Sequence, residues 1–170
     1  MTLAYVARFA TSAARLETYL ARKLRERGWD GDDPAEGTAA AREIVARFVE
    51  LAYVDDAGFA RMKAGSLLRR GYGARRIAQA LGQDGVDEAI REEVAPDAAE
   101  ARAAALAYAR KKGLGPFTRR GLEEDGRLGA ALREKQVAAL LRAGHAMDAA
   151  RAVVEAADPE SLTAWAEEGE

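Results

Sequence analysis

The sequence contains no cysteine, one histidine and few aromatic residues, and each scarcity excludes a class of protein. Without cysteine the chain can form neither a disulfide nor a thiolate metal site, which fits the cytoplasmic location that we expect. His145 follows a glycine that ends a helical pattern, so we interpret it as a loop or capping residue rather than a catalytic base. Aromatic residues make up only 6% of the chain, and abundant alanine and leucine favour packed helices over sheets.

Long apolar runs, strand-like alternation and complete cofactor motifs are also missing. No apolar run approaches the ~20 residues of a membrane helix, so we expect no membrane partner. The stretch from Gly71 to Arg76 is similar to half of a dinucleotide-binding loop, but it lacks the third glycine and follows a helix. The Asp32-Asp33 and Asp55-Asp56 pairs precede helical patterns and are interpreted as caps. We therefore expect a protein that is not an enzyme, with no catalytic residue, cofactor or metal.

A helical pattern that ends at a glycine recurs three times along the chain. The three glycines, Gly28, Gly85 and Gly144, lie 57 and 59 positions apart, and each follows leucine-type residues at helical spacing. A regular period is typical of one folding unit that has been copied. The sequence therefore predicts an all-α fold: a tandem array of three three-helix units, elongated and curved, which we expect to be a monomer.

The predicted units cover residues 1–54, 55–96 and 97–157, followed by an acidic tail at 158–170. The third unit carries an insertion. Its Lys111–Gly115 turn matches the Arg69–Gly73 turn at an offset of 42, whereas the later glycines differ by 59, so we place a loop at 118–133. Tyr53 and Phe59 are predicted core residues. Helices are expected at about 2–9, 13–27, 38–52, 57–70, 74–83, 86–94, 98–112, 134–143 and 147–156.

The formal net charge of −2 conceals separate basic and acidic blocks. Residues 57–83 contain six basic residues and no acid, 84–100 are mainly acidic, and 101–122 again contain six basic residues and no acid. Beyond Arg151 every charged residue is an acid. A small net charge is therefore compatible with strongly cationic surfaces.

Both basic blocks centre on a glycine turn between two helices. Arginine forks and the amides of a helix N-terminus suit an anionic partner, although the same residues could form solvated helix faces. Tyr72 and Phe117 lie beside the turns and could pack on a partner or within their own units. The predicted partner-binding residues are Arg69, Arg70, Arg75, Arg76, Lys111, Lys112, Arg119 and Arg120.

Several stretches of the chain resemble the RecX family of RecA regulators. The run Ala52-Tyr53-Val54-Asp55-Asp56-Ala57-Gly58-Phe59-Ala60 is similar to that family's Gly-Tyr-Leu-Asp-Asp-x-x-Phe-Ala signature, with Ala52 in place of the usual glycine. The resemblance continues through Arg70–Gly73, Lys112–Phe117 and Leu141–His145.

This resemblance implies a right-handed curved array that docks in the groove of the RecA filament on single-stranded DNA. It further implies suppression of the ATPase and strand-exchange activities of RecA. The residues alone leave two alternatives open: a general nucleic-acid-binding helical repeat protein without a recombinase partner, and a protein scaffold indifferent to DNA.

Overall fold

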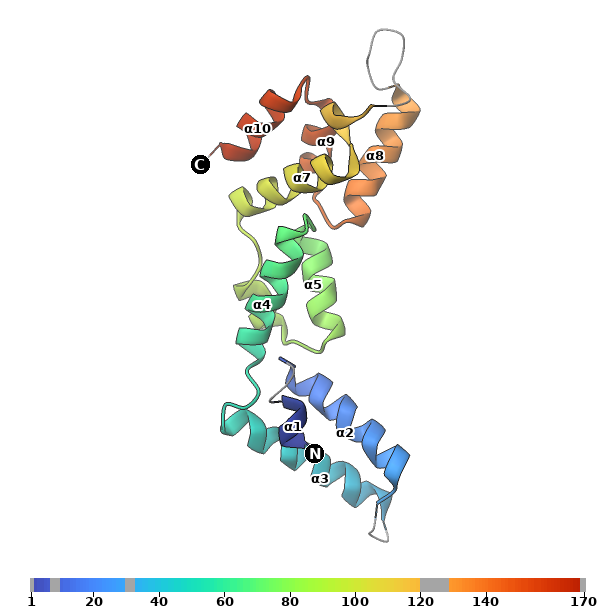
Figure 1. The fold of residues 1–170 in the computed structure, drawn as a ribbon, viewed down its shortest axis with the longest axis vertical. Coiled ribbons are helices and arrows are strands. Elements are labelled where there is room, and N and C mark those ends of the chain that lie inside the picture. The colour runs from blue at the N-terminus through green and yellow to red at the C-terminus, as the bar shows by residue number, and fades with distance from the viewer. Residues whose placement is uncertain (1, 7–9, 30–32, 120–128, 169–170) are drawn as a thin grey trace. The chain divides into compact units, whose positions relative to one another are not determined.

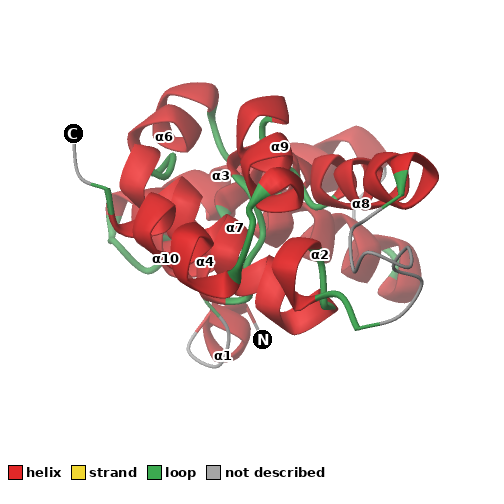
Figure 2. Ribbon diagram, turned by 90° about the horizontal axis from the view of Figure 1, so that it is seen from above, coloured by secondary structure: helices red, strands yellow, loops and turns green. Residues whose placement is uncertain are grey.

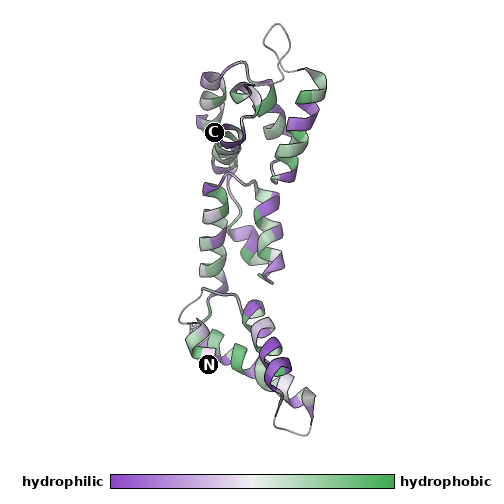
Figure 3. Cartoon of the chain, turned by 45° about the vertical axis from the view of Figure 1, so that its right-hand side comes forward, coloured by the Kyte–Doolittle hydropathy of each residue, from purple (hydrophilic) through white to green (hydrophobic). Residues whose placement is uncertain are grey.

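The computed structural model describes residues 2–6, 10–29, 33–119 and 129–168, and every regular element in these ranges is helical (Figure 2). The all-α prediction is confirmed. Figure 3 shows that the helices carry both hydrophilic and hydrophobic residues, as expected where one face is buried. The elements are α1 (Thr2–Val6), α2 (Ala13–Arg27), α3 (Pro34–Glu50), α4 (Asp56–Arg69), α5 (Ala74–Gln83), α6 (Glu88–Glu93), α7 (Ala98–Lys112), the 3₁₀ helix η1 (Gly115–Phe117), α8 (Ala130–Arg142), α9 (Met147–Glu155) and α10 (Pro159–Glu167) (Figure 1).

The chain forms two compact bodies. We call residues 1–63 and 81–94 the N-terminal body, and residues 64–80 and 95–170 the C-terminal body. The chain passes from one body to the other within α4 and again within α5.

The N-terminal body is built on α2 packed against α3. Ser12 begins α2 by accepting a hydrogen bond from the Arg15 amide at 3.2 Å, and its own hydroxyl donates to the Asp84 carbonyl at 2.5 Å. On α1, the Tyr5 ring stacks on Tyr19 with 4.1 Å between centroids. The buried core of this body consists of Leu16, Leu20, Ala41, Val45 and Val54.

The described aspartates that were predicted to cap helices accept hydrogen bonds from different helices. Asp33 caps α3 through the Ala35 amide at 2.8 Å, so this helix begins at Pro34 and not near residue 38. Asp55 accepts a hydrogen bond from the Gly58 amide at 2.9 Å, as a cap of α4 would. Asp56 instead accepts from the Ala13 amide at 2.8 Å, at the start of α2. Asp32 lies outside the described residues.

Of the two predicted core residues that follow α3, one is buried and one is not. Phe59 is buried, whereas Tyr53 is 53% exposed and Val54 takes the buried position. The chain leaves α3 through Ala52, whose φ of 56° lies in the left-handed region that residues other than glycine seldom adopt. The apolar stripe of α3 is also only partly used: Ala41 and Val45 are buried, but Ile44 and Val49 are exposed.

Four helices and η1 form most of the C-terminal body. Helix α7 packs against α9 and α10, and α8 packs against α9 (Figure 1). Left-handed Gly113, with a φ of 64°, ends α7, and Asp97 begins it through a capping box with Glu100. The buried core consists of Ala105, Leu106, Ala109, Leu140, Ala150, Val153, Val154, Leu162 and Ala166.

The acidic segment after residue 157, to which sequence analysis assigned no helix, contains α10. Asp158 and Ser161 form a capping box, and Leu162 and Ala166 are buried in the core. Glu160 and Glu167 lie on this helix and are not buried, whereas Leu162 and Ala166 pack inward. Residues 130–133 of the predicted 118–133 loop belong to α8, which begins at Ala130, and residues 120–128 lie outside the described part.

Two glycine turns of the C-terminal body are joined backbone to backbone. The Gly73 amide donates to the Ala143 carbonyl at 3.0 Å, and the Arg75 amide donates to the Gly144 carbonyl at 3.1 Å. The start of α5 thereby receives carbonyls from the end of α8, which satisfies backbone groups that each helix leaves unpaired. A Cβ atom on Gly73 would collide with the Gly144 carbonyl, so the contact requires glycine.

His145 completes this contact, which we call the glycine junction. Its Nε2 lies 3.0 Å from the Gly71 carbonyl oxygen and, because that oxygen only accepts, the nitrogen must donate. The ring is 2% exposed, and its centroid lies 5.6 Å from that of Tyr108. Burial lowers the pKa of His145, and the hydrogen bond to Gly71 opposes this effect in part. His145 lies in the loop after α8, as predicted, and it holds the arginine-bearing turn.

We expect Gly73→Ala to destabilise the C-terminal body by about 3 kcal/mol, because backbone atoms must move to admit the methyl group. Trp165, in a Trp29→Phe background, reports unfolding of this body in urea, since its ring packs against the core. Gly65→Ala is the control, because Gly65 lies within α4 near only the mobile end of Arg69, and we expect it to stabilise by roughly 0.5–1 kcal/mol. Equal stability of the two variants would contradict the glycine junction.

We expect the same body to lose stability as the pH falls from 7.5 to 5.5. The unfolded chain takes up a proton on His145 near its ordinary pKa of 6.5, whereas the folded chain resists protonation until a lower pH. The difference between the two pKa values adds to the free energy of unfolding. This addition is fully present above pH 6.5 and is lost as the pH falls through the pKa of the folded chain. Below that pKa the stability no longer changes through His145. His145→Gln keeps an N–H donor but does not titrate, so urea unfolding of this variant should depend less on pH. Parallel pH profiles for the two proteins would refute this role.

Candidate interaction surface

The predicted arginines of the first basic turn lie at the end of α4 and the start of α5. Arg69, Arg70, Arg75 and Arg76 are all exposed, whereas Gly71 and Gly73 between them are buried. The glycine junction therefore anchors the backbone of the turn and leaves the arginine side chains in solvent. We call these four residues the arginine turn.

Tyr72 lies between Arg70 and Arg75 in the sequence and packs inside the C-terminal body. It is half-buried, with its ring centroid 6.3 Å from that of Tyr108, and the Arg70 guanidinium lies 5.3 Å from the Tyr72 centroid. Such a cation–π contact orients the arginine while keeping its charge.

The second predicted group follows α7. Lys111 and Lys112 occupy its last turn and Arg119 follows η1, and all three are exposed. Arg120 lies outside the described residues. Phe117 is half-buried against the core, and the Arg110 guanidinium lies 5.8 Å from its ring centroid.

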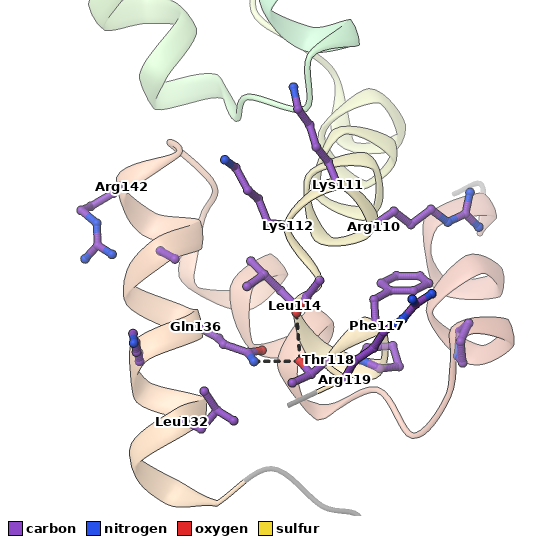
Figure 4. Close-up of a pocket in the computed structure, with 15 residues that line it drawn as sticks. Arg110, Lys111, Lys112, Leu114, Phe117, Thr118, Arg119, Leu132, Gln136 and Arg142 are labelled. Carbon is purple, nitrogen blue, oxygen red and sulfur yellow. Dashed lines mark hydrogen bonds between the residues drawn. The ribbon is translucent and has the colours of Figure 1, made fainter. Parts of the chain in front are cut away.

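A cavity of about 860 Å³ opens among the end of α7, η1 and α8 (Figure 4). We call it the cationic pocket, because the described residues that line it include six basic side chains and no acid. Leu114, Phe117 and Leu132 supply apolar surface to the lining. The basic residues are Arg110, Lys111, Lys112, Arg119, Lys135 and Arg142.

The polar groups at the base of the cationic pocket satisfy one another. The Gln136 side chain is 4% exposed, accepts from the Gly115 amide at 2.7 Å and donates to Thr118 Oγ1 at 2.8 Å. Thr118 in turn donates to the Gly113 carbonyl at 3.1 Å (Figure 4). These bonds hold the turn after α7 against α8. The charged groups left for a ligand are exposed cations.

Ion pairs divide sharply between the two bodies. All seven ion pairs among the described residues lie in the N-terminal body, where, for example, Arg15 and Lys63 both meet Asp84. No cation of the arginine turn or the cationic pocket forms an ion pair with another described residue. The C-terminal body thus concentrates positive charge that an anionic partner would neutralise.

Sequence reasoning missed Lys135 and Arg142. The acid-free block ends before Glu123, so a search for such blocks stops before it reaches α8. A helical signal was nevertheless present, because Leu132, Lys135, Ala139 and Arg142 are spaced by three, four and three residues, which places them on one helix face. All four line the cationic pocket.

Two searches of the described residues concern other classes of site. Among these residues, no group of three or more histidine, cysteine, aspartate or glutamate side chains is arranged to hold a metal ion. None of the helices in the described part of the chain combines the length and apolar character needed to cross a membrane.

Comparisons with known proteins agree on one family. The family model for the second three-helix domain of RecX matches residues 55–94, which contain α4, α5 and α6. The regulatory protein RecX of Myxococcus xanthus strain DK1622 is 35% identical over 158 residues, a match that covers 90% of this chain and 81% of that protein. Because this identity extends over most of both sequences, the chain belongs to the RecX family of regulatory proteins.

Proposed function

We propose that this protein binds the RecA filament on single-stranded DNA and suppresses its ATPase and strand-exchange activities. The observation that carries the proposal is the set of exposed cations in the C-terminal body that make no ion pair with another described residue. Membership of a family of regulatory proteins supports a role in control rather than in catalysis.

A filament suits a protein that carries more than one weak binding patch. The arginine turn and the cationic pocket are separate groups on one body, and a polymer presents the same binding site on each successive subunit. Once one patch is bound, the second contact becomes intramolecular and benefits from a high effective concentration. Individually weak surface charges can then give useful affinity.

Suppression of ATP turnover follows if the bound protein favours one arrangement of neighbouring subunits. A ligand shifts a conformational equilibrium only by its difference in affinity for the two states. Contacts to adjacent subunits would provide such a difference, because their spacing changes when the subunits move. The protein would then slow the filament without a catalytic group of its own.

The alternative is a nucleic-acid-binding protein with no recombinase partner, which the density of positive charge in the C-terminal body also favours. The two functions differ in stoichiometry. Suppression of the RecA ATPase at substoichiometric amounts favours filament binding, since masking bare DNA requires enough protein to cover it. Suppression only at saturating coverage would favour the alternative.

Replacing Arg69, Arg70, Arg75 and Arg76 together by alanine should raise the concentration needed for half-maximal ATPase suppression roughly tenfold, because exposed charge pairs are worth about 0.2–1 kcal/mol each. The measurement is the single-stranded-DNA-dependent ATPase of RecA, titrated with each protein at two salt concentrations. The helical circular dichroism signal should not change, because the four side chains are exposed.

The matched control replaces four exposed arginines of the N-terminal body, Arg22, Arg25, Arg27 and Arg42, by alanine. It removes the same charge from the body whose cations are already paired in part. We expect suppression close to that of the unaltered protein. Equal loss in both variants would show that net charge alone matters, and no loss in either would exclude the arginine turn.

A further inference from the structure

We infer that the cationic pocket binds the phosphate backbone of a single nucleic-acid strand directly, without help from a recombinase. The inference rests on the proposed function in that the strand would be the one held by the filament. It separates the two groups of cations in the C-terminal body, because the cationic pocket would contact the nucleic acid itself, whichever partner the arginine turn contacts. Its basis is the charge, the shape and the hydrogen bonding of the pocket.

Charge selects the class of ligand. Among the described residues, six basic side chains and no acid line a single cavity of about 860 Å³, which favours a ligand with several negative charges close together. A nucleic-acid strand carries one charge per nucleotide, and its binding releases condensed counterions. Both effects favour occupation of a pocket whose cations repel one another when it is empty.

Shape distinguishes a single strand from a duplex. The pocket is concave, with apolar surface from Leu114, Phe117 and Leu132 between the cations. A duplex presents phosphates outward on a convex rod and keeps its bases stacked inside, so it offers nothing to this apolar surface. A single strand can place phosphates on the rim and an unstacked base against the apolar lining.

Hydrogen bonding within the lining indicates that the pocket does not recognise one particular arrangement of ligand groups. Gln136 is the buried polar side chain of the lining, and both ends of its amide are occupied by Gly115 and Thr118. Lys111, Lys112 and Lys135 are half of the cations, and lysine acts as a mobile point charge rather than a fixed fork. Such point charges can follow a flexible chain of phosphates without requiring one fixed geometry, and arginine forks bind phosphate as well as carboxylate. The pocket is therefore suited to sequence-independent binding of a strand.

The test measures binding of the full chain to a fluorescein-labelled 30-nucleotide oligo(dT) by anisotropy, with no recombinase present, at several salt concentrations. The variant combines Lys112→Glu with Lys135→Glu, which removes one cation from each of two helices that form the pocket. We expect at least a tenfold loss of affinity. The log–log slope against salt should fall by about 1.4, since each lost phosphate contact contributes roughly 0.7 for a single strand.

The matched control combines Arg133→Glu with Arg151→Glu. Both arginines are exposed on α8 and α9 of the same body, neither lines the pocket, and the change in net charge is identical. We expect this control to retain most of its affinity. Equal losses in the two variants would overturn the inference, since net charge would then explain the binding.

Competition decides between ligand classes. Unlabelled oligo(dT) should displace the probe at lower concentration than a duplex or polyglutamate of equal charge. Better displacement by polyglutamate would overturn the inference in favour of an acidic protein surface. If Lys112→Glu/Lys135→Glu alters the thermal unfolding curve, Lys112→Gln/Lys135→Gln replaces it, and the same ranking against the control is required.

Recombinase assays separate this inference from the proposed function. If the pocket variant binds oligo(dT) normally but no longer suppresses the RecA ATPase, the pocket meets protein, so the inference fails and the proposed function stands. If the pocket variant loses oligo(dT) selectively while the unaltered protein never suppresses the ATPase, the inference stands and the proposed function fails.

Discussion

The contact between Gly73 and Gly144 is the constraint on which the arrangement of the C-terminal body depends. Amides at the start of α5 donate to carbonyls at the end of α8, at 3.0 and 3.1 Å, and no side chain could fit between the two turns. The opposed helix ends also bring the positive end of one dipole to the negative end of another. His145 adds a buried hydrogen bond to Gly71. A turn that carries four arginines is thereby held in place from behind, while its charges stay in solvent.

Charge in this protein is organised by what surrounds each cation rather than by how many there are. In the N-terminal body, Arg15, Lys63 and Arg61 meet carboxylates of Asp84 and Glu93. Such pairs neutralise the charge of these cations, and the exposed Arg61–Glu93 pair stabilises the fold little. In the C-terminal body many cations lie at helix ends and around one pocket, where no acid lines the part that the structure describes. Two bodies of one nearly neutral chain therefore present different surfaces to a partner.

Sequence reasoning succeeded where a local signal was strong and failed where neighbours made the decision. The expected ranges 13–27, 74–83 and 98–112 match α2, α5 and α7, and Gly28 ends α2 as predicted, whereas α3 begins at the Asp33 cap and not near residue 38. Tyr53 was misplaced because its exposure depends on how the chain turns at Ala52. Helix α10 was missed because the segment was read by its charge, as an acidic tail, although Leu162 and Ala166 pack against the core. The unit boundaries remain predictions.

The sequence by itself determined the helical class, the basic blocks and the resemblance to one family, because composition, period and motif are properties of the chain alone. Only the tertiary structure decided which cations stay unpaired among the described residues and which of them share a pocket. Lys112 and Lys135 lie 23 positions apart, and they line the same cavity because α7 and α8 both pack on α9. Pairing between distant helices depends on the buried faces that join them, and no local pattern records which faces will meet.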